Sequence, residues 1–144
     1  MLLAQSRHET ALGKEWMSVK ISQLHLSDFM LFQQADFQWS PGINVICGTN
    51  STGKTALIKL MYSLHKSYEQ WNSTETKEAA VNRFSEKLCG VFRPDNGKVG
   101  RLVRRKQGNA QMTASMGYEN GTSIDVNFGN RASKIATLIL PKME

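Results

Sequence analysis

The chain has 144 residues, of which 40% are hydrophobic and 21% charged, and it contains 18 Lys and Arg against 12 Asp and Glu residues. This composition is typical of a globular protein, and the length suits one domain with its own core. No apolar run approaches the length of a membrane span, and the N-terminal residues lack the long apolar stretch of a signal peptide. We therefore expect a cytoplasmic protein with no membrane partner.

Cysteine and histidine usage excludes a disulfide framework and an evident metal centre. The two cysteines, Cys47 and Cys89, are too few for a disulfide scaffold. We interpret Cys47 as a small buried thiol and Cys89 as a residue that closes a helix before Gly90. The three histidines share no metal-ligand spacing with the cysteines: His8, His25 and His65.

The first third of the chain predicts a hairpin that leads into a buried strand. Residues 1–16 show no clear period, and we interpret them as a flexible lead. From Val19 apolar and polar residues alternate, which predicts a half-buried strand, a loop at 28–31 and a second strand at 34–39. A Ser-Pro-Gly turn at 40–42 is followed by the run Ile-Asn-Val-Ile-Cys at 43–47, which predicts a short buried strand.

Directly after this strand, eight residues fit the phosphate-binding loop G-x-x-x-x-G-K-[ST]. They are Gly48, Thr49, Asn50, Ser51, Thr52, Gly53, Lys54 and Thr55. A strand before the loop and a helix after it form the context that gives this motif structural meaning. We predict that these eight residues bind the phosphates of a nucleotide.

Each residue type in the loop has a physical reason. The two glycines leave room for the backbone to curl around a phosphate, and the start of a helix offers backbone N–H groups without partners. Lys54 supplies a mobile positive charge for the β- and γ-phosphates, and the Thr55 hydroxyl is predicted to be a ligand of Mg²⁺. The residues between, 49–52, contribute mainly N–H groups.

The rest of the chain predicts two helices and then an antiparallel meander. The helix at 55–68 carries an apolar stripe: Leu57, Ile58, Leu60, Met61, Tyr62 and Leu64. A second helix is predicted at 77–88, with Gly90 just past its end. Strands are predicted at 99–105, 111–118, 123–128 and 135–140, separated by turn residues. We expect a core at 17–92 and a meander at 98–140.

Positive charge is concentrated between positions 93 and 106, where a single acidic residue, Asp95, stands among six basic ones. They are Arg93, Lys98, Arg101, Arg104, Arg105 and Lys106. Such a cluster suits contact with the phosphates of DNA or RNA. A solvated hairpin with basic residues on its exposed face accounts for the same pattern, and the sequence leaves both interpretations open.

Residues 21–29 and 42–55 together resemble one branch of the P-loop proteins. It comprises the ABC-type ATPase heads, which include RecF, the structural-maintenance-of-chromosomes proteins and the OLD-like AAA ATPases of bacterial defence. The resemblance implies an α/β fold, the N-terminal lobe of a P-loop NTPase, with ATP and Mg²⁺ as cofactors. The chain departs from the family pattern at Ser51, often Gly, and at Asp28, often Asn. Met30 or Leu31 stands where a basic residue is common, so no adenine-binding residue is assigned.

Two further family motifs are missing from the chain. Hydrolysis in this family needs an apolar strand ending in Asp-Glu and a Ser-Gly-Gly-type signature from a second subunit, and no segment here supplies either. Residues 17–144 therefore resemble an incomplete lobe, with no catalytic residue of its own. We expect ATP–Mg²⁺ binding, and hydrolysis only with a C-terminal lobe and a homodimer partner.

Two other functions fit the sequence less well. One is a non-catalytic module that contacts nucleic acid or protein and carries a structural or vestigial nucleotide site. The other is a small P-loop kinase or GTPase, which the missing Asn-Lys-x-Asp run and the antiparallel strands disfavour.

Overall fold

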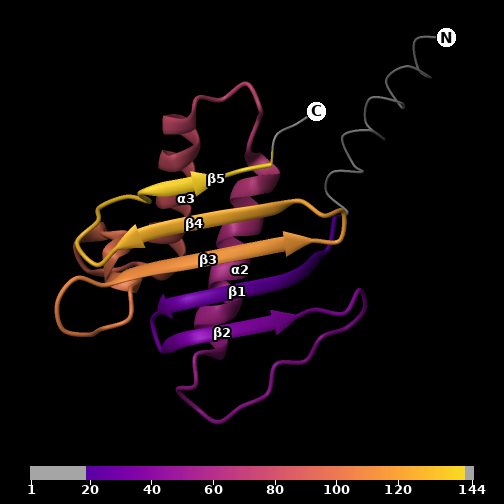
Figure 1. The fold of residues 1–144 in the computed structure, drawn as a ribbon, viewed down its shortest axis with the longest axis horizontal. Coiled ribbons are helices and arrows are strands. Elements are labelled where there is room, and N and C mark those ends of the chain that lie inside the picture. Colours follow the sequence, from indigo (N-terminus) through magenta and orange to yellow (C-terminus); the bar gives the residue numbers. More distant parts are fainter. Residues whose placement is uncertain (1–18, 142–144) are drawn as a thin grey trace.

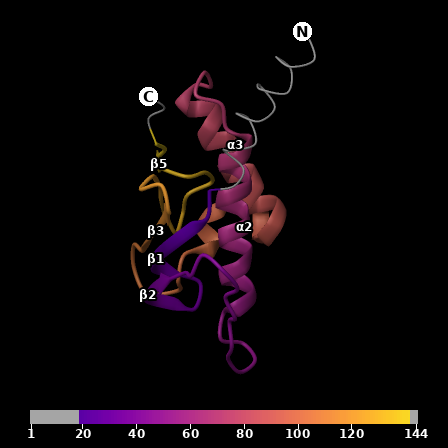
Figure 2. The same cartoon turned by 90° about the vertical axis from the view of Figure 1, so that its right-hand side faces the viewer.

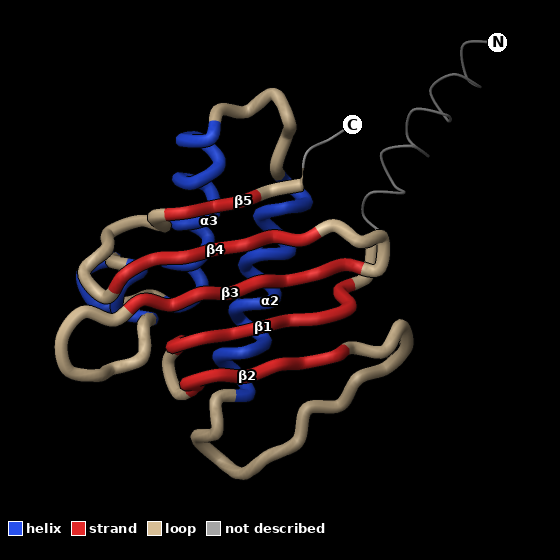
Figure 3. Tube along the Cα trace, in the orientation of Figure 1, coloured by secondary structure: helices blue, strands red, loops and turns tan. Residues whose placement is uncertain are grey.

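A single antiparallel sheet is the frame of the protein. The computed structural model describes residues 19–141. Within that range the strand order is β2-β1-β3-β4-β5, and every neighbouring pair is antiparallel (Figures 1 and 3). The strands are β1 (Ile21–Phe29), β2 (Phe32–Gln38), β3 (Gln111–Tyr118), β4 (Ser123–Gly129) and β5 (Thr137–Ile139).

Two helices, α2 (Lys54–Gln70) and α3 (Lys77–Phe92), lie on one face of this sheet, and no helix among residues 19–141 covers the other face (Figure 2). The predicted alternation is confirmed, because every second residue of the inner strands is buried against the helices. The buried residues are Leu24, Leu26, Met112, Ala114, Met116, Ile124, Val126 and Phe128. Since β1 pairs with β3, the hairpin and the meander form one sheet.

Helix α2 buries only part of its predicted stripe. Leu57, Leu60 and Leu64 are fully buried against the sheet, as predicted. Ile58 and Tyr62 are each 54% exposed, so their placement in the core was wrong. The sheet covers one side of α2 and α3 packs beside it (Figure 2), which leaves the side that carries these two residues open to solvent.

The predicted strand at 43–47 is absent. These residues have no regular structure, and Ile43 and Val45 are 93% and 78% exposed. Cys47, expected to be buried, is an exposed free thiol. A strand exists only where a neighbour completes its ladder of hydrogen bonds, and no described strand lies in register beside this segment.

The predicted strand at 99–105 was also wrong. Residues Val99–Leu102 form a 3₁₀ helix, and only Val103 makes an isolated bridge to Phe29. Gly100 lies so close to the chain at Asn130 that a Cβ atom there would be 2.6 Å from the Asn130 carbonyl oxygen. This close approach buries Val99 and Leu102 beneath the sheet, which an extended strand would not do.

Two predicted boundaries were misplaced. Helix α3 continues through Gly90 to Phe92 because Phe92 packs edge-on against Phe29, with 5.8 Å between ring centroids. Burial of this ring outweighs the cost of a glycine inside a helix, about 1 kcal/mol. Arg93, with φ of 50°, ends the helix, so Cys89 lies inside its last turn. The last strand is shorter than predicted and covers Thr137–Ile139.

Several expectations concern absences or undescribed residues. Among residues 19–141 no helix is long and apolar enough to cross a membrane. In the same range no three His, Cys, Asp or Glu side chains gather as metal ligands would. Cys89, like Cys47, is a free thiol. The predicted flexible lead at 1–16, with His8, lies outside the described residues.

A half-buried histidine joins α2 to β3. The Nδ1 atom of His65 lies 3.0 Å from the Tyr118 hydroxyl, and its Nε2 atom lies 3.4 Å from a Glu69 oxygen. Burial lowers the pKa of His65, and the charge of Glu69 opposes this effect only in part. Burial also raises the pKa of Tyr118, so its hydroxyl stays protonated and donates to a neutral imidazole.

We predict that His65 makes the fold sensitive to mild acid. The unfolded chain binds the proton at an ordinary histidine pKa, and the folded chain binds it less tightly. Stability is therefore lost as the pH falls below that ordinary value and through the lowered folded pKa. Thermal melting at pH 7.5 and 5.5 should show a smaller loss for His65→Gln than for the natural chain. An equal loss in both proteins would contradict this role.

Candidate functional site

The eight residues of the predicted phosphate loop lie together at the start of α2. The chain reaches the loop from the exposed segment 43–47 and enters the helix at Lys54. Gly53 precedes the helix with φ of 91°, a left-handed conformation that favours glycine. Thr55 is exposed in the first turn, where its hydroxyl oxygen is of the type that Mg²⁺ prefers.

The two glycines of the motif lie in close quarters, and Gly53 is sterically required. A Cβ atom on Gly53 would lie 2.8 Å from the Phe32 ring of β2, and its φ of 91° is left-handed. A Cβ atom on Gly48 would lie 2.9 Å from the Thr52 hydroxyl, so a side chain there needs that hydroxyl to rotate away. The loop is therefore folded closely on itself and against the β1–β2 hairpin.

The N-terminus of α2 is open to an anion. No side chain caps it, and its first turn carries no acidic residue. Helix α3 differs, because the Thr76 hydroxyl accepts a hydrogen bond from the Ala79 N–H at 3.1 Å and Glu78 lies in the first turn. The first N–H groups of a helix have no partner within it and carry its positive partial charge. In α2 these groups face the loop.

Lys54 folds back over the loop. Its ammonium group donates to the carbonyl of Gly48 at 2.6 Å and also to the carbonyl of Thr49. The Thr52 hydroxyl donates to the Thr49 carbonyl at 2.9 Å and lies 3.5 Å from the ammonium group. Carbonyl dipoles thus hold the positive charge above the loop, where the oxygens of a phosphate, which bear full negative charge, would compete for it.

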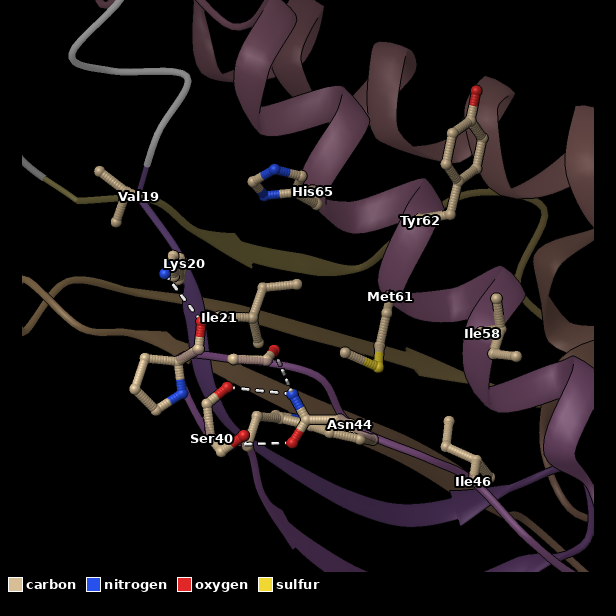
Figure 4. A pocket seen from close by; sticks show the side chains of 13 residues that line it. Val19, Lys20, Ile21, Ser40, Asn44, Ile46, Ile58, Met61, Tyr62 and His65 are labelled. Carbon is tan, nitrogen blue, oxygen red and sulfur yellow. Dashed lines mark hydrogen bonds between the residues drawn. The ribbon is translucent and has the colours of Figure 1, made fainter.

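A groove adjoins the segment that leads to the loop. It has a volume of about 700 Å³ and lies between residues 39–46 and the open side of α2 (Figure 4). Its lining is mostly apolar and includes Trp39, Ile46, Ile58 and Met61. The indole N–H of Trp39 is buried with no hydrogen-bond partner. Side chains of this kind ordinarily belong to a core.

Sequence reasoning missed this groove because it assigned the whole stripe of α2 to one core. The signal was present in the width of the stripe. Ile58 and Tyr62 extend it well beyond the row of leucines that faces the sheet. A helix with so wide an apolar surface needs a second covering layer.

The basic residues at 93–106 lie on the connection between α3 and β3, on neither a hairpin nor a strand of the meander. The connection is fixed to the β1–β2 turn, because the N–H of Arg104 donates to the Asp28 carbonyl at 2.7 Å. Lys106 forms an ion pair with the Asp28 carboxylate at 2.6 Å. One of the six positive charges is thereby neutralised.

The chain is similar to known families over most of the described range. A family model described as an AAA domain matches residues 23–136. The DNA replication and repair protein RecF of Streptococcus equi subsp. zooepidemicus is 27% identical over 99 residues, and that of Limosilactobacillus reuteri is 34% identical over 77 residues. The RecF protein of Renibacterium salmoninarum is 46% identical over 41 residues. No solved structure matches the chain significantly.

These matches cover unequal shares of the proteins compared. They include 60%, 49% and 28% of this chain but 27%, 21% and 10% of the three RecF proteins. The chain thus spans about a quarter or less of the length of these relatives. These matches support the predicted resemblance to RecF. The predicted resemblance to the OLD-like ATPases stays a prediction.

We predict that Ser51 stores strain in the loop. Its φ of 63° is left-handed, which costs a residue with a side chain about 1–2 kcal/mol. Ser51→Gly removes that cost but adds unfolded-state entropy worth about 0.4–1 kcal/mol. Urea unfolding should therefore show a net gain of about 0.5–1 kcal/mol.

Ser51→Ala is the matched control, because alanine keeps the strain and removes only the hydroxyl. Its stability should stay close to that of the natural chain. A glycine variant less stable than the alanine variant would contradict the strained conformation.

Proposed function

This chain belongs to the AAA domain family, and we propose that it is the ATP–Mg²⁺-binding lobe of a RecF-like ATPase. The observation that carries the proposal is the open N-terminus of α2 next to a loop in which Gly53, with its left-handed φ, has no room for a side chain. Such a site offers backbone N–H groups and a helix dipole to a phosphate. Among the described helices of this length, α3 lacks this opening because Thr76 caps it.

In the proposed complex, the triphosphate lies in the loop 48–55 with its β-phosphate before the helix N-terminus. Lys54 leaves the carbonyls of Gly48 and Thr49 and pairs with the β- and γ-phosphates, since charge-assisted hydrogen bonds are the stronger ones. The Thr55 hydroxyl holds Mg²⁺. The ion would supply positive charge that offsets the negative charge of the phosphates.

Hydrolysis is proposed to depend on a second lobe and a homodimer partner. Two features support this. Ile43 and Val45 are almost fully exposed, although burying each would contribute about 1.5–3 kcal/mol, and the groove beside them exposes the open side of α2. Strands of a second lobe would complete the ladder at 43–47 and cover this groove. The lobe would also bring the carboxylate that activates water, which the motifs of this chain do not include.

Titration calorimetry tests the nucleotide site. The natural chain should bind ATP in a saturable, Mg²⁺-dependent manner, with hydrolysis near background. Lys54→Ala should weaken binding at least tenfold, because a charged hydrogen bond to phosphate contributes about 1.5–3 kcal/mol. Its melting temperature should hardly change, since the hydrogen bonds of the Lys54 ammonium group go to the loop and not to the core.

Lys66→Ala is the matched control. It removes a lysine from the same helix, about three turns away, whose ammonium group pairs with the half-buried carboxylate of Glu69 at 2.8 Å. ATP affinity should be unchanged in this variant. Equal loss in both variants, or no loss in Lys54→Ala, would overturn the phosphate-binding role of the loop.

A second proposal concerns nucleic acid. The relatives are named for DNA replication and repair, and the basic connection is held in place at the β1–β2 turn through Asp28. We propose that Arg104 and Arg105 contact the phosphates of DNA. This contact would form with or without nucleotide. It would therefore also suit a non-catalytic module whose nucleotide site is only structural.

Double replacement of Arg104 and Arg105 by Ala should weaken the binding of a short duplex and lower the slope of log affinity against log salt by about 2. Fluorescence anisotropy at several salt concentrations measures both. Replacement of Lys77, which is exposed at the start of α3 and therefore at the opposite end of that helix from the basic connection, should leave the slope nearly unchanged. An unchanged slope in the double variant would exclude this surface.

A further inference from the structure

The two edges of the described sheet differ in how they are protected. Edge strand β5 has three residues, and the chain reaches Pro141 two positions later. Edge strand β2 has seven residues, Phe-Gln-Gln-Ala-Asp-Phe-Gln, with no proline and no lysine or arginine. Short length, proline and charged side chains, especially lysine, are the usual devices that stop an edge from pairing with another chain. The β5 edge has short length and a nearby proline, and β2 has only the charge of Asp36.

We propose that the β2 edge pairs with the β2 edge of a second copy of this chain, antiparallel and about a twofold axis. The pair extends the sheet across two molecules without using the nucleotide site. Such isologous contacts close on themselves, so the product is a dimer rather than a fibre. The N–H and C=O groups on the free side of β2 gain partners in this arrangement.

The sequence of β2 selects one register. In a twofold antiparallel pair, the residue at the axis lies opposite its own copy. An axis at Ala35 uses all seven residues and places Gln34 opposite Asp36 of the second copy, so each carboxylate meets a neutral amide. An axis at Asp36 would oppose two carboxylates, which is unfavourable. An axis at Gln34 would pair only five residues.

Electrostatics within each molecule supports the same register. Asp36 pairs with His25 across the hairpin, and Gln34, Asp36 and Gln38 are exposed. No cation lies on β2, although the chain carries a net charge of +6. The self-pairing about Ala35 therefore brings no two like charges directly opposite each other.

The sheet itself supplies a matched control position. The register places Gln34 opposite Ser27, Ser27 opposite Thr113, Thr113 opposite Asn127 and Asn127 opposite Thr137. Gln34 and Thr137 are thus the two ends of one row across the sheet, and both are exposed. A charge at Thr137 changes the net charge as one at Gln34 does, but lies on the β5 edge.

Sedimentation velocity of the chain without nucleotide, from about 5 to 200 μM, tests the proposal. The natural chain should show a reversible monomer–dimer equilibrium in this range. Gln34→Asp places two carboxylates opposite each other at two symmetric positions and should weaken the dimer about tenfold. Gln34→Lys creates two Lys–Asp pairs and should strengthen it. Thr137→Asp and Thr137→Lys should leave the dimer constant unchanged.

Several results would overturn the proposal. One is a monomer at every concentration, also for Gln34→Lys. Another is a dimer that the Thr137 variants change as much as the Gln34 variants do, since that would reflect net charge alone. The outcome is separable from that of the nucleotide site, because Lys54→Ala should dimerise as the natural chain does.

Discussion

The packing of α2 against the sheet is the constraint on which the phosphate loop depends. Leu57, Leu60 and Leu64 are fully buried on the inner face, and burial of each contributes about 1.5–3 kcal/mol. The first of them lies three residues after Lys54, so less than one turn separates the start of the helix from a fully buried leucine. Contact of Gly53 with the Phe32 ring then fixes where the loop meets the hairpin. The core of the sheet thereby positions the open N–H groups.

The same helix carries apolar residues on a second side, which does not face the sheet. Its leucines face the sheet. Ile58 and Tyr62 lie on the other side of the helix, where they line the groove. A helix between two layers needs apolar residues on both sides. The segment 43–47 lies beside this open side of α2 and carries the apolar, β-branched residues Ile43 and Val45, which are exposed. The exposed apolar surface discussed here therefore lies on one side of α2.

Sequence reasoning succeeded where the structure is decided by nearby residues. In β3 and β4 every second residue is apolar, and in α2 the leucines recur at helical spacing. Each pattern matches an element that is covered on one side. The phosphate loop stays a prediction, and its glycines and lysine answer a local steric and electrostatic need that the sequence alone expresses. The failures at 43–47 and 99–105 were decided by distant contacts. The former has no neighbouring strand, and the latter bends because Gly100 meets the chain at Asn130.

In the β1–β2 turn, contacts with residues distant in sequence offset the free-energy cost of a strained backbone. Asp28 and Met30 both have left-handed φ, 49° and 47°, a cost of about 1–2 kcal/mol each. The backbone there is held from outside, since the Met30 N–H donates to the Leu102 carbonyl at 2.9 Å and the Asp28 carbonyl accepts from Arg104. Each bond contributes about 1 kcal/mol, and the Lys106 ion pair adds to them. Since Phe32 follows Met30 by two residues, the connection that carries the basic side chains also holds the hairpin against the phosphate loop.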